Sequence, residues 1–140
     1  LERLKEESGN FFQYGFLEEV KDILNGKFNV DYGNLLSGSM TRLGCRPKWS
    51  WDNWMTDKNR SGLVPFDLHI HDLDFMVYTF GKPKETHAFK STTDTQDYLN
   101  TVYNYDGFFI TTEASWYASP YPFKAAFRFQ FEHSFSSTSL

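Results

Sequence analysis

Residues 61–83 constrain the fold most, because they contain a helix start, a helix stop and a helical repeat between the two. Pro65 is tolerated in a first helical turn, and Gly81 followed by Pro83 is a usual way to end a last turn. Apolar side chains recur at helical spacing and form one stripe about 100° wide, as in a helix that faces a core: Leu63, Phe66, Ile70, Leu73, Val77 and Phe80. We therefore predict one helix with this stripe against the core.

Four polar side chains share one side of the predicted helix, next to the stripe. Positions i, i+4, i+7 and i+11 fall within about 60° of one another, and they hold Asp67, His71, Asp74 and Tyr78. Apolar residues also lie beyond this polar strip, at Val64, Leu68 and Phe75. Part of the strip should therefore be shielded from water, and shielded ionisable groups often have shifted pKa values and functional roles.

Downstream of the helix the sequence changes to strand patterns. Residues 85–92, 97–105 and 108–116 alternate, and Asp106-Gly107 between the last two is a strong hairpin signal. In residues 123–135 the phenylalanines share odd positions, which predicts a strand with one apolar face that must be covered. Helices followed by hairpin-connected strands predict an α+β fold, with an open, largely antiparallel β-sheet and helices on one face.

Two further segments lie upstream of the helix. Residues 34–43 alternate loosely and carry small side chains, which predicts a strand approached closely by another part of the protein. Residues 44–60 hold three tryptophans among Pro, Asn and Asp, so we expect an aromatic loop that lies over the polar strip.

The first residues have the pattern of a separate unit. Residues 1–7 resemble the last turns of a helix, and residues 11–16 a short strand. Residues 16–25 repeat at helical spacing, with a glycine just past the end. We therefore assign residues 1–16 to the remnant of a preceding domain and residues 17–140 to a domain of their own.

Composition argues against several classes of function. The net charge is -4 and no basic run occurs, which argues against nucleic acid as the main partner. No apolar run approaches the roughly 20 residues of a membrane span, and the sequence shows no signal-peptide pattern. The single cysteine, Cys45, excludes a disulfide framework and suits a reducing cytoplasm, where we expect the protein to be. The aromatic content of 19% predicts either a very aromatic core or a broad face buried against another subunit.

The polar strip offers one candidate site. Asp67 and His71 can act as a pair, because a carboxylate fixes the tautomer of an imidazole, and a neutral imidazole moves protons near pH 7. An ordinary exposed Asp/His pair on a helix surface is the alternative interpretation. In a continuous helix His69 projects away from Asp67, so we expect it to face solvent and not to share a metal ion with His71. His87 and His133 lie in predicted strands without a nearby cluster of carboxylates or thiols, and we predict no metal site.

Residues 61–83 resemble a characteristic stretch of a known family. They are similar to the Gly-Gly-x-x-x-Asp-x-x-x-His-x-x-Asp stretch of the glucose-fructose oxidoreductase / inositol dehydrogenase (Gfo/Idh/MocA) family of NAD(P)-dependent dehydrogenases, through Ser61-Gly62, Asp67, His71-Asp72, Asp74, Gly81 and Pro83. The resemblance extends to Ser39-Met40-Thr41-Arg42, to the tryptophan loop, to Asn104-Tyr105-Asp106-Gly107 and to Ala114-Ser115-Trp116. The family's first glycine is Ser61 here, and its Gly-x-Gly-x-x-Gly turn and Glu-Lys-Pro motif are absent from the sequence.

This resemblance implies the C-terminal domain of a two-domain NAD(P)-dependent oxidoreductase, with the Rossmann domain absent. It implies that His71 is the catalytic acid/base toward a sugar, polyol or related hydroxy compound, and that Asp67 orients substrate and imidazole. Arg42 and Trp51 are expected to bind substrate together with these two residues.

The resemblance also bears on cofactor and partners. NAD or NADP would be bound mainly by the missing domain, with no cofactor-binding residue in this chain, so the chain alone is expected to be inactive. The sheet is expected to join copies into a homo-oligomer. The alternative is a non-catalytic binding or scaffold domain of the same fold that mediates oligomerisation.

Overall fold

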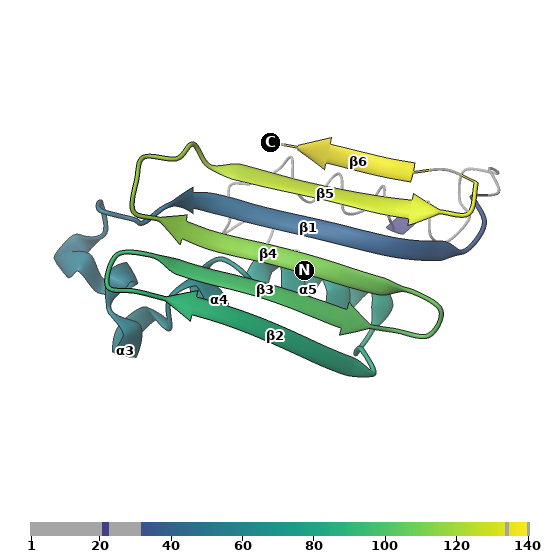
Figure 1. Cartoon of the computed structure of the whole chain (residues 1–140), viewed down its shortest axis with the longest axis horizontal. Coiled ribbons are helices and arrows are strands. Elements are labelled where there is room, and N and C mark those ends of the chain that lie inside the picture. The colour runs from purple at the N-terminus through teal and green to yellow at the C-terminus, as the bar shows by residue number, and fades with distance from the viewer. Residues whose placement is uncertain (1–20, 23–31, 134, 140) are drawn as a thin grey trace.

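A six-stranded sheet forms one layer of the protein (Figure 1). The structure is a computed structural model, which describes residues 21–22, 32–133 and 135–139. The strands are β1 (Leu35–Cys45), β2 (Glu85–Thr92), β3 (Asp97–Asn104), β4 (Phe109–Tyr117), β5 (Lys124–Phe131) and β6 (Phe135–Ser139). Their order across the sheet is β2-β3-β4-β1-β5-β6. The predicted open α+β sheet is confirmed. The predictions for residues 1–16 lie outside the described residues, and so does most of the helix predicted over 16–25.

The pairing is largely antiparallel, as predicted, around one parallel pair at the centre. β1 runs parallel to β4, with Met40 opposite Thr112, and antiparallel to β5, with Met40 opposite Phe127. The pairs β2–β3, β3–β4 and β5–β6 are antiparallel. The predicted hairpin turn joins β3 to β4, where Gly107 takes the left-handed conformation at φ 82 that glycine tolerates best.

The small residues of β1 allow close packing, which confirms the predicted close approach. A Cβ atom at Gly38 would lie 2.7 Å from the ring of Phe129 and 3.2 Å from the side chain of Ile110. Both side chains are buried, at 1% and 0% exposure. Glycine at this position therefore makes room for the aromatic ring that β5 contributes to the core.

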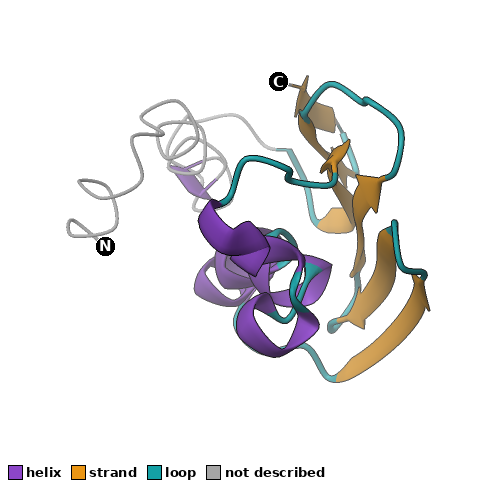
Figure 2. Cartoon of the chain, turned by 90° about the vertical axis from the view of Figure 1, so that its left-hand side faces the viewer, coloured by secondary structure: helices purple, strands orange, loops and turns teal. Residues whose placement is uncertain are grey.

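Short helical segments cover one side of the sheet (Figure 2). They are η1 (Trp51–Thr56), α3 (Lys58–Ser61), α4 (Val64–Asp67) and α5 (Ile70–Phe80). The prediction of one continuous helix over 61–83 is therefore wrong, and so is the prediction of a plain loop over 44–60. Gly62, at φ 72, ends α3, and a turn at Leu68–His69 separates α4 from α5.

Only half of the apolar stripe that the periodicity predicted faces the core, through Leu63, Leu73 and Phe80. Phe66, Ile70 and Val77 are 71%, 38% and 39% exposed. Asp72 and Met76, which the continuous helix placed on another side, are 2% and 0% exposed. The breaks change the helical phase, and the polar groups on the buried side find partners in distant strands, which spacing alone does not reveal.

Two clusters of buried apolar residues join the helices to the sheet. One contains Met40, Phe75, Met76, Tyr103, Ile110, Phe129 and Phe131. The other contains Met55, Leu63, Val64, Leu99, Ala114 and Trp116. The predicted apolar face of residues 123–135 is covered at Phe129 and Phe131, whereas Phe123 is 59% exposed. The aromatic rings of β5 thus form much of the floor on which α5 lies.

Candidate functional site

Asp67 and His71 lie on either side of the break between α4 and α5. Asp67 is the last residue of α4 and is half-buried, and His71 is the second residue of α5 and is exposed. Burial raises the pKa of the Asp67 carboxyl, and the charge of His71 opposes that shift. The two side chains therefore interact electrostatically, and the partial shielding predicted for the polar strip holds for Asp67 but not for His71.

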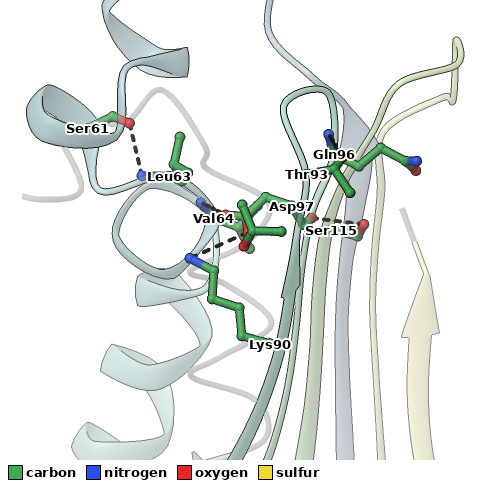
Figure 3. A network of polar contacts seen from close by, with 9 residues as sticks. Ser61, Leu63, Val64, Lys90, Thr93, Gln96, Asp97 and Ser115 are labelled. Atoms are coloured by element: carbon green, nitrogen blue, oxygen red, sulfur yellow. Dashed lines mark hydrogen bonds and ion pairs between the residues drawn. The ribbon is translucent and has the colours of Figure 1, made fainter.

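A buried carboxylate on the sheet holds the start of α4 (Figure 3). Asp97, at the first position of β3, is 3% exposed, and its Oδ2 accepts the backbone N–H of Val64 at 3.0 Å. The Thr92 hydroxyl donates to Oδ1 at 2.5 Å, and the Lys90 Nζ lies 3.5 Å from that oxygen. The β2–β3 hairpin thereby fixes the segment that carries Asp67.

The backbone just before α4 is strained. Leu63 has φ 63 and ψ -153, a region that is nearly restricted to glycine and costs about 1–3 kcal/mol. The Ser61 hydroxyl oxygen accepts the N–H of Leu63 at 2.9 Å, and the Leu63 side chain is 7% exposed. Asp52 and Asn53 also have positive φ, at 52 and 49. Left-handed residues thus occur on both sides of α3, leading directly into the candidate site.

The two other predicted substrate-binding residues lie in different surroundings. Arg42 on β1 is 7% exposed, and its Nε donates to Asp72 Oδ1 at 2.7 Å. Burial raises the pKa of the Asp72 carboxyl, and the adjacent guanidinium opposes that shift. Trp51, the first residue of η1, is 82% exposed. Arg42 therefore lies beneath the helices, and Trp51 lies on the surface.

His69 is the residue that sequence reasoning placed wrongly. It is 4% exposed instead of facing solvent, and its Nε2 lies 2.9 Å from Thr112 Oγ1 and 3.1 Å from the Tyr103 hydroxyl. Burial lowers the pKa of the His69 imidazole, which is therefore neutral at pH 7. No local signal marks this position, because the hydroxyl partners come from β3 and β4, far away in the sequence.

Several large apolar and aromatic side chains are exposed on η1, α4, α5 and the residues before η1. They are Trp49, Trp51, Trp54, Phe66, Ile70, Val77 and Tyr78. Lys21 places its Nζ 3.8 Å from the centre of the Tyr78 ring. Exposed apolar side chains on the same helices as ionisable groups are typical of a binding or interaction face.

Two features are absent from the described part of the chain. No group of three or more His, Cys, Asp or Glu side chains in these residues could hold a metal ion. Among the same residues, no helix is both long enough and apolar enough to span a bilayer. The described residues offer an exposed imidazole that interacts electrostatically with a half-buried carboxylate. Such an imidazole can transfer a proton to or from a hydroxyl group.

Comparison with known proteins places this fold. Residues 28–133 match a family model described as the GFO/IDH/MocA C-terminal domain. A comparison with curated proteins gives no significant match.

Solved structures with the same fold include three dehydrogenases. A myo-inositol dehydrogenase from Corynebacterium glutamicum has a TM-score of 0.68 at 16% identity, over 87% of this chain and 37% of that one. Levoglucosan dehydrogenase, in complex with NADH, has a TM-score of 0.69 at 20% identity, over 85% and 35%. The WlbA dehydrogenase from Thermus thermophilus, in complex with NAD and UDP-GlcNAcA, has a TM-score of 0.62 at 16% identity, over 87% and 39%. The chain thus spans well under half the length of each.

Proposed function

Because the chain belongs to the Gfo/Idh/MocA family, which it matches over residues 28–133, we propose that it is the substrate-binding, catalytic-residue-bearing domain of an NAD(P)-dependent oxidoreductase. The substrate class is a sugar, polyol or related hydroxy compound. The observation that carries the proposal is that Asp67 and His71 lie on either side of the break between α4 and α5 and interact electrostatically, with the His71 side chain exposed.

In this proposal His71 moves the proton of the reacting hydroxyl group. A neutral imidazole takes that proton as an alcohol is oxidised to a carbonyl and returns it in the reverse direction. Asp67 orients the imidazole and the substrate hydroxyl, and its own partial burial strengthens this interaction. Exposed Trp51 offers a flat apolar face to a sugar ring. Arg42 is buried beneath the helices and contributes to substrate binding through its hydrogen bond to Asp72.

The nicotinamide cofactor would be held mainly by another domain, because the sequence contains no Gly-x-Gly-x-x-Gly turn. When bound, NAD or NADP would accept or donate the hydride. The exposed stripe of Phe66, Ile70 and Val77 supports this arrangement, since an apolar surface beside the candidate site suits the docking of a cofactor-binding domain. This chain alone should therefore be inactive.

The proposal includes self-association through the side of the sheet opposite the described helices (Figure 2). Side chains alternate along a strand, so those flanking buried Met40 and Arg42 point to this open face. From the register, its centre contains Ser39, Thr41, Thr111, Glu113, Ala126 and Arg128.

Exposed Cys45 is compatible with a reducing compartment, and a cytoplasmic location is part of the proposal.

The test is turnover by the complete dehydrogenase, measured as NAD or NADP reduction with myo-inositol, levoglucosan and glucose as probes. His71→Ala should lower kcat by about 100-fold to 10,000-fold and leave the KM for the nicotinamide nearly unchanged. Asp67→Asn should fall between the wild type and His71→Ala, because an amide keeps the shape of the carboxylate but not its charge.

The matched control is His87→Ala, which removes an exposed imidazole on β2. It should leave turnover at the wild-type level. If His71→Ala and Asp67→Asn both kept wild-type turnover, the alternative of a non-catalytic scaffold domain would replace the proposal.

A further inference from the structure

His69 lies in the turn between α4 and α5, which separates the two proposed catalytic residues. The N–H groups of Leu68 and His69 both donate to the carbonyl oxygen of Val64, at 3.0 and 2.9 Å. The second of these bonds spans five residues, which is the pattern of a single wide turn and is frequent at functional sites. The carbonyl oxygen of His69 then accepts the N–H groups of Asp72 and Leu73, at 3.0 and 3.1 Å, and so starts α5.

The wide turn decides how Asp67 and His71 face each other. In an uninterrupted helix, side chains four residues apart stack along one face. Here an additional residue enters the turn between the end of α4 and the start of α5, so the angle between the two side chains depends on the conformation at His69. Whatever fixes His69 therefore fixes the geometry of the pair.

Side chains of the sheet fix His69. Its ring stacks against Tyr103 on β3 with 6.1 Å between ring centroids and 19° between planes. Its Nε2 is within hydrogen-bond distance of the Tyr103 hydroxyl and of Thr112 Oγ1 on β4. All three residues are buried, at 4%, 5% and 1% exposure. The turn between α4 and α5 is thus held by side chains of two neighbouring strands, β3 and β4.

If His69 served only to fill space in the core, an imidazole would be less favourable than an apolar ring. Burying polar groups costs free energy unless they are hydrogen-bonded, and an apolar ring of similar size fills space without that cost. What the imidazole adds is direction, because a hydrogen bond defines where the ring must point. This contrast separates a packing role from a positioning role.

We propose that His69, held by Tyr103 and Thr112, is a positioning residue that sets the mutual orientation of Asp67 and His71. The inference rests on the proposed function, because it assigns His69 a role in the work of that pair. His69 touches neither substrate nor cofactor in this scheme and acts through the backbone turn.

The test replaces the polar cluster in two steps in the complete dehydrogenase. Tyr103→Phe/Thr112→Val removes both hydrogen-bond partners of His69 Nε2 and should lower both the unfolding midpoint and kcat. Adding His69→Phe makes the cluster apolar, and replacing all partners of a buried hydrogen bond by similar shapes is nearly neutral for stability. The triple variant should therefore recover most of the unfolding midpoint while kcat stays at least about 10-fold below the wild type, since a small misplacement of catalytic groups is enough for such a loss.

Three measurements distinguish the possible outcomes: the unfolding midpoint, kcat and the KM for NAD, with myo-inositol or whichever probe above is turned over. Ser115→Ala, which removes another buried hydroxyl on β4 that donates to the Asp97 carbonyl, should leave kcat unchanged. Wild-type kcat in the triple variant, with His71→Ala inactive, would overturn the positioning role alone. Wild-type turnover in His71→Ala would overturn the proposed function, and the inference with it.

Discussion

Arg42 and Asp72 form a buried ion pair between β1 and α5. Removing one partner of such a pair leaves an uncompensated buried charge and typically costs about 3–5 kcal/mol. Arg42→Met should therefore lower the free energy of unfolding by roughly that amount, measured by urea denaturation. Asp72→Leu in the same background should restore a large part of the loss, since the second charge is then removed as well. A double variant less stable than Arg42→Met would contradict this account of the pair.

Asp67 predicts a dependence of stability on pH. Burial raises the pKa of this carboxyl in the folded protein above its ordinary value, so folding favours the protonated form. A raised folded pKa contributes stability below the unfolded value, and this contribution is lost as pH rises through the folded pKa. Between about pH 3 and pH 7 the wild type should therefore lose stability relative to Asp67→Asn, by less than about 1 kcal/mol because the group is half exposed. Urea denaturation at both pH values measures the difference, and a relative gain by the wild type would refute it.

At the scale of elements, truncation of neighbouring residues of α5 should lower the free energy of unfolding by very different amounts. Met76 is 0% exposed and packs in the core, whereas the next residue, Val77, is 39% exposed. Met76→Ala should cost about 2–5 kcal/mol of unfolding free energy, and Val77→Ala less than about 1 kcal/mol. Thermal or urea unfolding of the two variants tests which face of α5 is buried. Equal losses of unfolding free energy in the two variants would mean that Val77 is buried as well.

The strands could be predicted more reliably than the helices. Alternation and the Asp106-Gly107 turn are local signals, and they located β2, β3 and β4 to within about one residue. The helical stretch misled because half of its apolar stripe is exposed and its buried face also carries His69 and Asp72. His69 and Asp72 can be buried because they form hydrogen bonds with Thr112 and Arg42. These partners are distant in the sequence and follow no spacing rule. Helical spacing and the family resemblance both indicate Asp67 and His71, whose catalytic role stays a prediction.

At the scale of the whole molecule, the open face of the sheet should control self-association. Thr41 lies near its centre, between Glu113 on β4 and Ala126 on β5. Thr41→Arg would place a bulky charge in a closely packed contact, so it should shift the complete protein to smaller species in sedimentation velocity. Asn59→Arg adds the same charge at an exposed position of α3 and should leave the sedimentation coefficient unchanged. Identical profiles for wild type and Thr41→Arg would exclude this face as the contact.

The central parallel pair has a consequence for how the protein is made. Both partners of β1 come much later in the sequence, since Met40 lies opposite Thr112 on β4 and Phe127 on β5. Such non-local pairing raises the contact order and slows folding. During synthesis, β1 leaves the ribosome long before either partner exists, and the middle of the sheet closes only after β5 has been translated. Arg42 and the serine and glycine residues of β1 suit this delay, because they interrupt its apolar residues, and an interrupted apolar run is less prone to aggregate.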